Sequence, residues 1–225
     1  MSVSTTPLPA PPKKSGLGCL GCGCLVLALV VILFLGLVTG VCYLAYTKVV
    51  SLTSTTPAAV PTFNGSDDVY NTAQQKIKAF AHDVENHQAA TIRLNADEIN
   101  TLIARNSASI GQKAHLFVTL ANDRAQVQAS LPTDVLSHGI LKDRYLNFDT
   151  TFGLGFNSDT KSLDLDLHHL QIGEQATPQN LLPTMQGELA SLLNAELQKH
   201  PETRDLLQQA KSIEIKDGEL VIETQ

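Results

Sequence analysis

The chain has 225 residues, a formal net charge of −6 and four cysteines, and is long enough for one domain of ordinary size beside a shorter apolar segment. All 22 acidic residues but only 13 of the 16 lysines and arginines lie at or after Asp67, so this part carries a charge of −9. A surface of that sign repels nucleic acid and anionic lipid headgroups. The charge therefore excludes a basic-patch nucleic-acid binder, and any lipid contact is expected to be apolar.

The most apolar part of the chain is residues 17–46. Its centre, residues 25–45, has no charged side chain over about twenty residues, which is the length of a helix that crosses a bilayer. A cleaved signal peptide would have a shorter apolar region that ends in a small-x-small site. The sequence therefore predicts a retained transmembrane helix that acts as a signal-anchor.

The flanks of this run give its orientation. Lys13 and Lys14 precede it and Lys48 follows it, which favours a cytoplasmic N-terminus and a C-terminal part outside the cytoplasm. The prediction is a single-pass protein of the cell membrane. Its parts are a disordered cytoplasmic tail (1–16), the signal-anchor (17–46), a Pro/Ser/Thr linker (47–66) and an extracytoplasmic domain (67–225).

The four cysteines, Cys19, Cys22, Cys24 and Cys42, all lie in or beside the apolar run. The domain from Asp67 onward has none, so it must be held by core burial rather than by disulfides. For the cluster of Cys19, Cys22 and Cys24, plain packing in the helix is favoured. Acylation at the cytoplasmic face and metal binding are the alternatives.

Two helices and a short strand are predicted next. An amphipathic helix runs from Asp67 to about Gln88, since apolar residues recur there at three- and four-residue steps. A short extended piece, Thr91 to Leu94, follows. Asn95 and Glu98 then form a variant of the capping box that begins a helix from Ala96 to Arg105.

Three hairpins are predicted from the match between turn residues and alternating apolar residues. A turn at Asn122-Asp123 pairs Leu116, Val118 and Leu120 with Ala129, Val127 and Ala125. A turn at Asp217-Gly218 pairs Ile213 and Ile215 with Ile222 and Leu220. A loop over 157–160 pairs Phe152 and Leu154 with Leu165 and Leu163.

The apolar phase changes at His168-His169, which predicts a β-bulge or bend there. Asp164, Asp166 and His168 share the polar face of the same strand. A solvated face is favoured over a metal site for these side chains.

The longest helix outside the apolar run is predicted from Thr177, as N-cap before Pro178, to about His200. It carries a broad apolar stripe that includes Leu181, Met185, Leu189, Leu193 and Leu197. Pro201 ends it, and a short helix from Glu202 to Ala210 precedes the last hairpin. The predicted fold class is α+β, with a transmembrane helix followed by one domain in which a curved antiparallel sheet packs on this long helix.

The segment from Thr91 to Ile103 (TIRLNADEINTLI), followed by the hairpins, the apolar helix over 181–197 and the closing hairpin, resembles the YpmS-type family of anchored bacterial envelope proteins. The resemblance covers the chain from Thr91 to its end. It implies a relative of tubular lipid-binding folds, in which a curved sheet wraps a long helix and leaves an apolar groove.

The predicted function is a binding or scaffold module for an apolar ligand or a partner protein. Its groove is expected between the sheet and the long helix, lined by Phe148, Phe152, Leu154, Met185, Leu189 and Leu193. The predicted partners are the membrane and a lipid or envelope protein. No cofactor, metal or catalytic residue is assigned, because no G-x-S-x-G, H-E-x-x-H or phosphate-loop motif is present. The alternative is an envelope enzyme without a recognisable motif.

Overall fold

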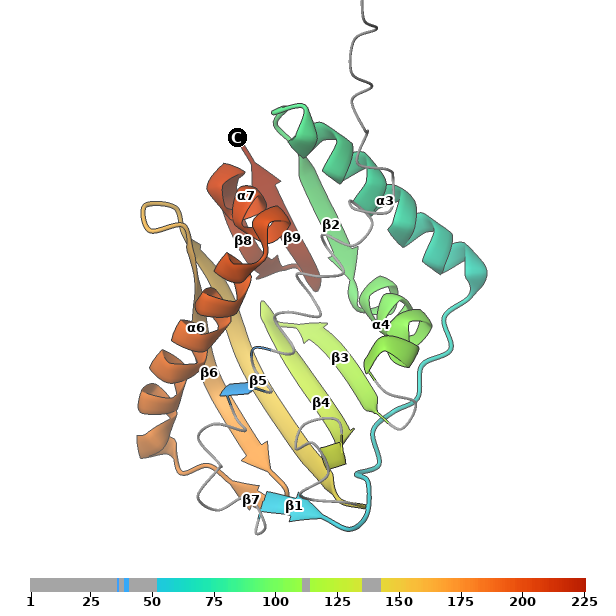
Figure 1. Ribbon diagram of the computed structural model, residues 1–225, viewed down its shortest axis with the longest axis vertical. Helices are drawn as coiled ribbons and strands as arrows, with labels where there is room; N and C mark the ends of the chain where they lie inside the picture. Colours follow the sequence, from blue (N-terminus) through green and yellow to red (C-terminus); the bar gives the residue numbers. More distant parts are fainter. Residues whose placement is uncertain (1–35, 37–38, 41–51, 111–113, 135–142) are drawn as a thin grey trace, which may run out of the picture.

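The computed structural model describes residue 36 and residues 39–40, 52–110, 114–134 and 143–225 (Figure 1). Within these residues the predicted α+β class and antiparallel pairing are confirmed. Sheet A is curved and has the strand order β3-β4-β5-β6-β7, with β1 paired to β5, and sheet B has the order β2-β9-β8.

The strands of sheet A are β1 (Thr53–Ser54), β3 (His115–Ala121), β4 (Arg124–Pro132), β5 (Tyr145–Asn157), β6 (Ser162–Ile172) and β7 (Gln175–Ala176). Those of sheet B are β2 (Thr91–Asn95), β8 (Ala210–Lys216) and β9 (Glu219–Thr224). The helices are α3 (Asp67–Glu85), α4 (Ala96–Ile110), the 3-10 turn η2 (Gln179–Leu181), α6 (Leu182–Lys199) and α7 (Pro201–Gln209). In Figure 1, α3 and α4 lie at the right of the strands, and α6 and α7 lie at the left.

Two predicted hairpins are confirmed residue by residue. Leu120 pairs with Ala125 and Val118 with Val127, as the Asn122-Asp123 turn requires. Both turn residues have positive φ, 51° and 59°, which is the geometry of a type I′ turn and which Asn and Asp tolerate. The Asp217-Gly218 turn likewise gives the predicted register between β8 and β9.

The third hairpin, β5–β6, has the predicted faces but a register that differs by two residues. Leu154 pairs with Leu165, not with Leu163, and Asn157 pairs with Ser162. The physical reason is the side chain of Asn157, whose Oδ1 accepts hydrogen bonds from the backbone N–H groups of Asp159 and Thr160. This turn keeps Asn157 in the strand and moves the loop to residues 158–161.

The predicted bulge is confirmed. Thr151 pairs with His169 and Phe152 with Leu167, so His168 is the additional residue on β6. The hydroxyl of Thr150, fully buried, donates to the backbone oxygen of His169. The additional residue explains why the apolar side chains of β6 lie on one face both before the bulge, at Leu167, and after it, at Leu170.

The helices begin close to the predicted residues, with one exception, and α4 continues past its predicted end at Arg105 to Ile110. Ser66 caps α3 by accepting from Val69 N, and Pro201 starts α7 directly after α6. The long helix does not start at Thr177, however: the N–H of Thr177 donates to Leu170 O on β6, and α6 starts at Leu182 after η2. The backbone at Thr177 is therefore still hydrogen-bonded to β6, and the helix begins only after the chain has left the sheet.

The transmembrane helix and signal-anchor of the predicted fold are contradicted. Within the described part of the chain, no helix is both long and apolar enough to cross a bilayer. The predicted span, 17–46, lies outside the described residues apart from Gly36, Thr39 and Gly40. These three are helical, and both glycines are buried against α6. The prediction relied on the length and uncharged character of the run, and these features do not distinguish lipid from a protein interior.

Residues 52–66, predicted as part of a linker, lie along the domain. Thr53 and Ser54 pair with β5, and the side-chain amide of Asn147 holds the backbone at both Thr56 and Ala58. At the end of this segment, a Cβ on Gly65 would lie 1.9 Å from the hydroxyl oxygen of Thr101, so only glycine fits there. The predicted tail, 1–16, lies outside the described residues.

Candidate functional site

The six residues predicted to line a groove belong to one apolar cluster. Phe148, Phe152 and Leu154 lie on one face of β5 and are 4, 8 and 8% exposed. Leu189 and Leu193 of α6 are buried in the same cluster, and Met185 is half-buried against it. We call these six residues the apolar layer. Because its members on β5 are covered, the layer is an interior surface of the molecule.

The helix α6 reaches this layer from the edge of the sheet. It packs on β6, the outermost long strand. The side chain of Asn194 accepts from Leu163 N and donates to Leu163 O, both at 2.8 Å, and Gln186 accepts from Leu167 N. These amides satisfy backbone groups that an edge strand leaves unpaired. They fix α6 along β6.

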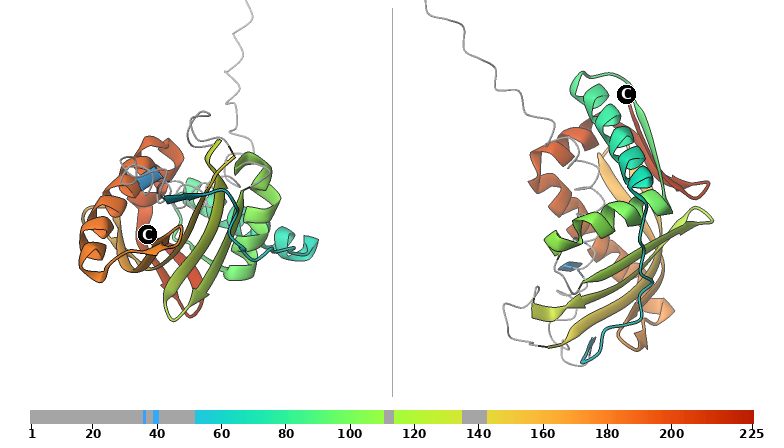
Figure 2. Two further views of the ribbon diagram at one scale, coloured as in Figure 1. Left: turned by 90° about the horizontal axis from the view of Figure 1, so that it is seen from below. Right: turned by 90° about the vertical axis from the view of Figure 1, so that its right-hand side faces the viewer.

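The opposite edge of sheet A is closed in the same manner. Asn100 of α4, 2% exposed, accepts from Val118 N at 2.8 Å and donates to Val118 O at 2.7 Å. A helix amide therefore replaces a neighbouring strand at both edges of the sheet. The inner face of sheet A lies between these two helices, and Figure 2 shows them on opposite sides of it.

Two glycines from the apolar run contact the side of α6 that Leu189, Leu192 and Leu193 form, which we call its inner side. A Cβ on Gly40 would lie 2.7 Å from Leu189 Cδ2 and 3.0 Å from Leu192 Cδ1. At Gly36 it would lie 3.1 Å from Leu193 Cδ1, whereas Thr39 is exposed. In Figure 2 the short blue piece that holds these residues lies beside α6. Two glycines four residues apart let a helix approach another helix closely.

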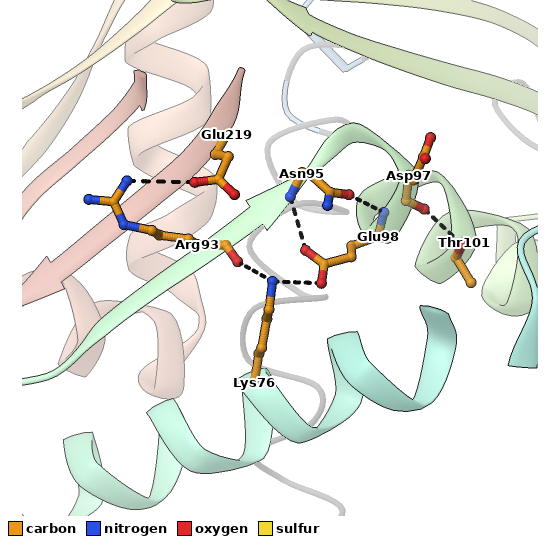
Figure 3. Close-up of polar contacts among 7 residues, drawn as sticks. All are labelled: Lys76, Arg93, Asn95, Asp97, Glu98, Thr101 and Glu219. Atoms are coloured by element: carbon orange, nitrogen blue, oxygen red, sulfur yellow. Dashed lines mark hydrogen bonds and ion pairs between the residues drawn. The ribbon is translucent and has the colours of Figure 1, made fainter. Parts of the chain in front are cut away.

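A second polar cluster joins α3, β2 and α4 (Figure 3). Glu98, 4% exposed, accepts from Asn95 N at 3.0 Å, and Asn95 Oδ1 accepts from Glu98 N at 2.9 Å, so the predicted capping box is confirmed. Lys76 forms an ion pair with Glu98 at 2.6 Å and donates to Arg93 O. Sequence reasoning missed Lys76, because its partners lie seventeen and twenty-two residues away. The polar groups of this cluster are hydrogen-bonded or paired with one another, so the cluster stabilises the packing of α3, β2 and α4.

On the outer face of sheet A, a pocket of about 190 Å³ lies beneath residues 58–60. Asp149 in its wall accepts hydrogen bonds from the amides of Gln126 and Gln128. Gln171, also in the wall, donates to Gly173 O. These polar groups therefore have partners within the wall itself, whereas Asn147, also in the wall, holds the backbone at Thr56 and Ala58 on the sheet.

The histidine-carboxylate group predicted as a metal alternative is only partly assembled. His168 lies 3.2 Å from Asp166, and among the described residues no three His, Cys, Asp or Glu side chains are placed to hold a metal. Elsewhere, a hydrogen bond from Lys199 lowers the pKa of Glu196 at the end of α6, against the opposing effect of burial. Cys19, Cys22 and Cys24, the candidates for acylation, lie outside the described residues.

Comparison of the chain with protein-family models, with curated proteins and with solved structures finds no match. The resemblance to the YpmS-type family therefore stays a prediction. Assignment of a function rests on the geometry of the apolar layer.

Proposed function

We propose that this domain is a non-enzymatic binding module that holds an apolar ligand, such as an acyl chain, in the apolar layer between sheet A and α6. A binding site of this kind needs a continuous apolar lining and few charges. The layer meets this requirement through three β5 side chains and three α6 side chains.

The observation that carries the proposal is the contact of Gly36 and Gly40 with α6. These two glycines belong to the most apolar run of the chain and lie against Leu189, Leu192 and Leu193. The inner side of α6 can thus accept an apolar guest rather than packing only on its own sheet. The domain's charge of −9 fits an apolar rather than an anionic recognition chemistry.

The proposal is tested by what the purified full chain carries and takes up. Mass spectrometry of an organic extract of the denatured protein should find a lipid at close to one equivalent. The folded protein should also bind a fluorescent fatty-acid probe. Absence of both would contradict the ligand site, and a scaffold for a partner protein would then be the better account.

A pair of variants makes the test specific. Leu189→Gln places an amide in the layer and should weaken probe binding about fivefold or more, because an unpaired buried amide costs roughly 1 kcal/mol or more. Leu181→Gln is the matched control, because Leu181 is 47% exposed on the turn before the same helix. Circular dichroism of both variants establishes that they are folded. Equal affinities for the two would place the probe elsewhere.

A further inference from the structure

We infer that the inner side of α6 is a docking surface for a glycine-faced helix, and that this chain's own helical residues Gly36, Thr39 and Gly40, called the docked turn, occupy it in cis. The inference rests on the proposed function, because it names what fills the same site when no ligand is bound. An apolar ligand would then have to displace this turn to reach α6.

The contact has the features of a matched interface. Gly36 and Gly40 lie one helical turn apart and are both buried, while Thr39 between them is exposed, so the glycines define one face. The α6 residues that meet this face, Leu189, Leu192 and Leu193, follow a three- and four-residue spacing and also form one side of their helix. Leucine side chains on one helix thus lie where the other has no side chain.

The spacing at Gly40 shows why the fit depends on glycine. A Cβ there would lie 2.7 Å from Leu189 Cδ2, closer than carbon atoms approach without one of them moving. A larger side chain at Gly40 must therefore separate the turn from α6. At Thr39, by contrast, a larger side chain extends into solvent.

Occupation in cis predicts competition with a ligand. A turn that is docked in roughly nine of ten molecules raises the apparent Kd of a competing ligand about tenfold. Opening the turn should lower that Kd by the same factor without any change in the layer itself. The docked turn would thus compete with the ligand and set its apparent Kd.

The test uses photo-crosslinking in the full chain. The sequence has only two methionines, Met1 and Met185. In a Met185→Leu/Leu192→Met variant, photo-methionine places its diazirine at position 192, which contacts Gly40. We expect irradiation to join position 192 to the peptide that contains Gly40. Mixing light chains with chains labelled with ¹⁵N shows whether the bond forms within one chain.

Each outcome decides a different step. A bond within one chain that is lost in Gly40→Leu and kept in Thr39→Leu supports docking in cis, whereas no bond, or a bond only between chains, overturns it. Gly40→Leu should also bind the fatty-acid probe about tenfold more tightly than Thr39→Leu. Equal probe affinities after loss of the crosslink overturn the competition. Lack of probe binding by every variant would contradict the proposed ligand site, and the crosslink would still decide the docking.

Discussion

Glu98 is a buried carboxylate that serves two neighbours. It accepts from Asn95 N to close the start of α4, and it pairs with Lys76 of α3. Lys76 in turn donates to Arg93 O on β2 (Figure 3). The side chain of Lys76 therefore connects α3 with both α4 and β2. A carboxylate at 4% exposure is costly to bury unless its oxygens have partners, and here both have them.

Two substitutions separate the roles of Glu98. Glu98→Gln keeps an oxygen that can accept from Asn95 N but removes the charge, and it should lower the free energy of unfolding by about 1 kcal/mol. Glu98→Ala removes the cap as well and should cost about 2 kcal/mol. Urea denaturation of the full chain measures both. Equal losses would mean that the cap contributes nothing beyond the ion pair.

At the scale of the elements, the amides that close the sheet edges contribute both stability and placement. Asn100→Ala leaves the N–H and C=O of Val118 without their side-chain partner in a buried setting. We expect a loss of about 2 to 4 kcal/mol in the free energy of unfolding. Asn106→Ala is the control on the same helix, because Asn106 donates only to Leu102 O within α4 and should cost about 1 kcal/mol or less. Similar losses would show that Val118 finds another partner, such as water.

These elements differ in how far they could be predicted from sequence. Hairpins followed from local signals, because a two-residue turn fixes the register and alternation fixes the face. The β5–β6 loop did not, because Asn157 can end a strand or start a turn, and its own hydrogen bonds decide between them. The amides of Asn100 and Asn194 gave no signal, since an asparagine inside a helix pattern says nothing about a strand far along the chain.

At the scale of the whole molecule, periodicity gives the face of each strand and helix but not how the apolar layer is assembled. Phe148, Phe152 and Leu154 alternate along β5 and therefore share one face, which is buried. Which strand α6 would follow depends on tertiary hydrogen bonds that periodicity does not contain. The uncharged run was interpreted by its length, whereas its contacts with α6 arise from the spacing of two glycines.

Leu193 belongs to the core of the domain and also contacts the docked turn. It is 1% exposed in the apolar cluster, and a Cβ at Gly36 would lie 3.1 Å from its Cδ1. Leu193→Ala should therefore lower the free energy of unfolding by about 2 to 5 kcal/mol, through lost burial and the cavity that remains. Leu181→Ala, at a side chain 47% exposed, should change it by about 0.5 kcal/mol or less. Denaturant titration of the full chain measures both.

Repeating the titration with Gly40→Leu apportions the effect. This variant tests whether part of the loss at Leu193 comes from contact with the docked turn. If it does, the loss of unfolding free energy caused by Leu193→Ala should be smaller by about 0.5 kcal/mol or more in the Gly40→Leu background, where that contact is open. An unchanged cost would assign the whole effect to packing of α6 within the domain. A cost below about 1 kcal/mol in both backgrounds would mean that Leu193 is not a core residue, which would contradict its burial in the apolar layer.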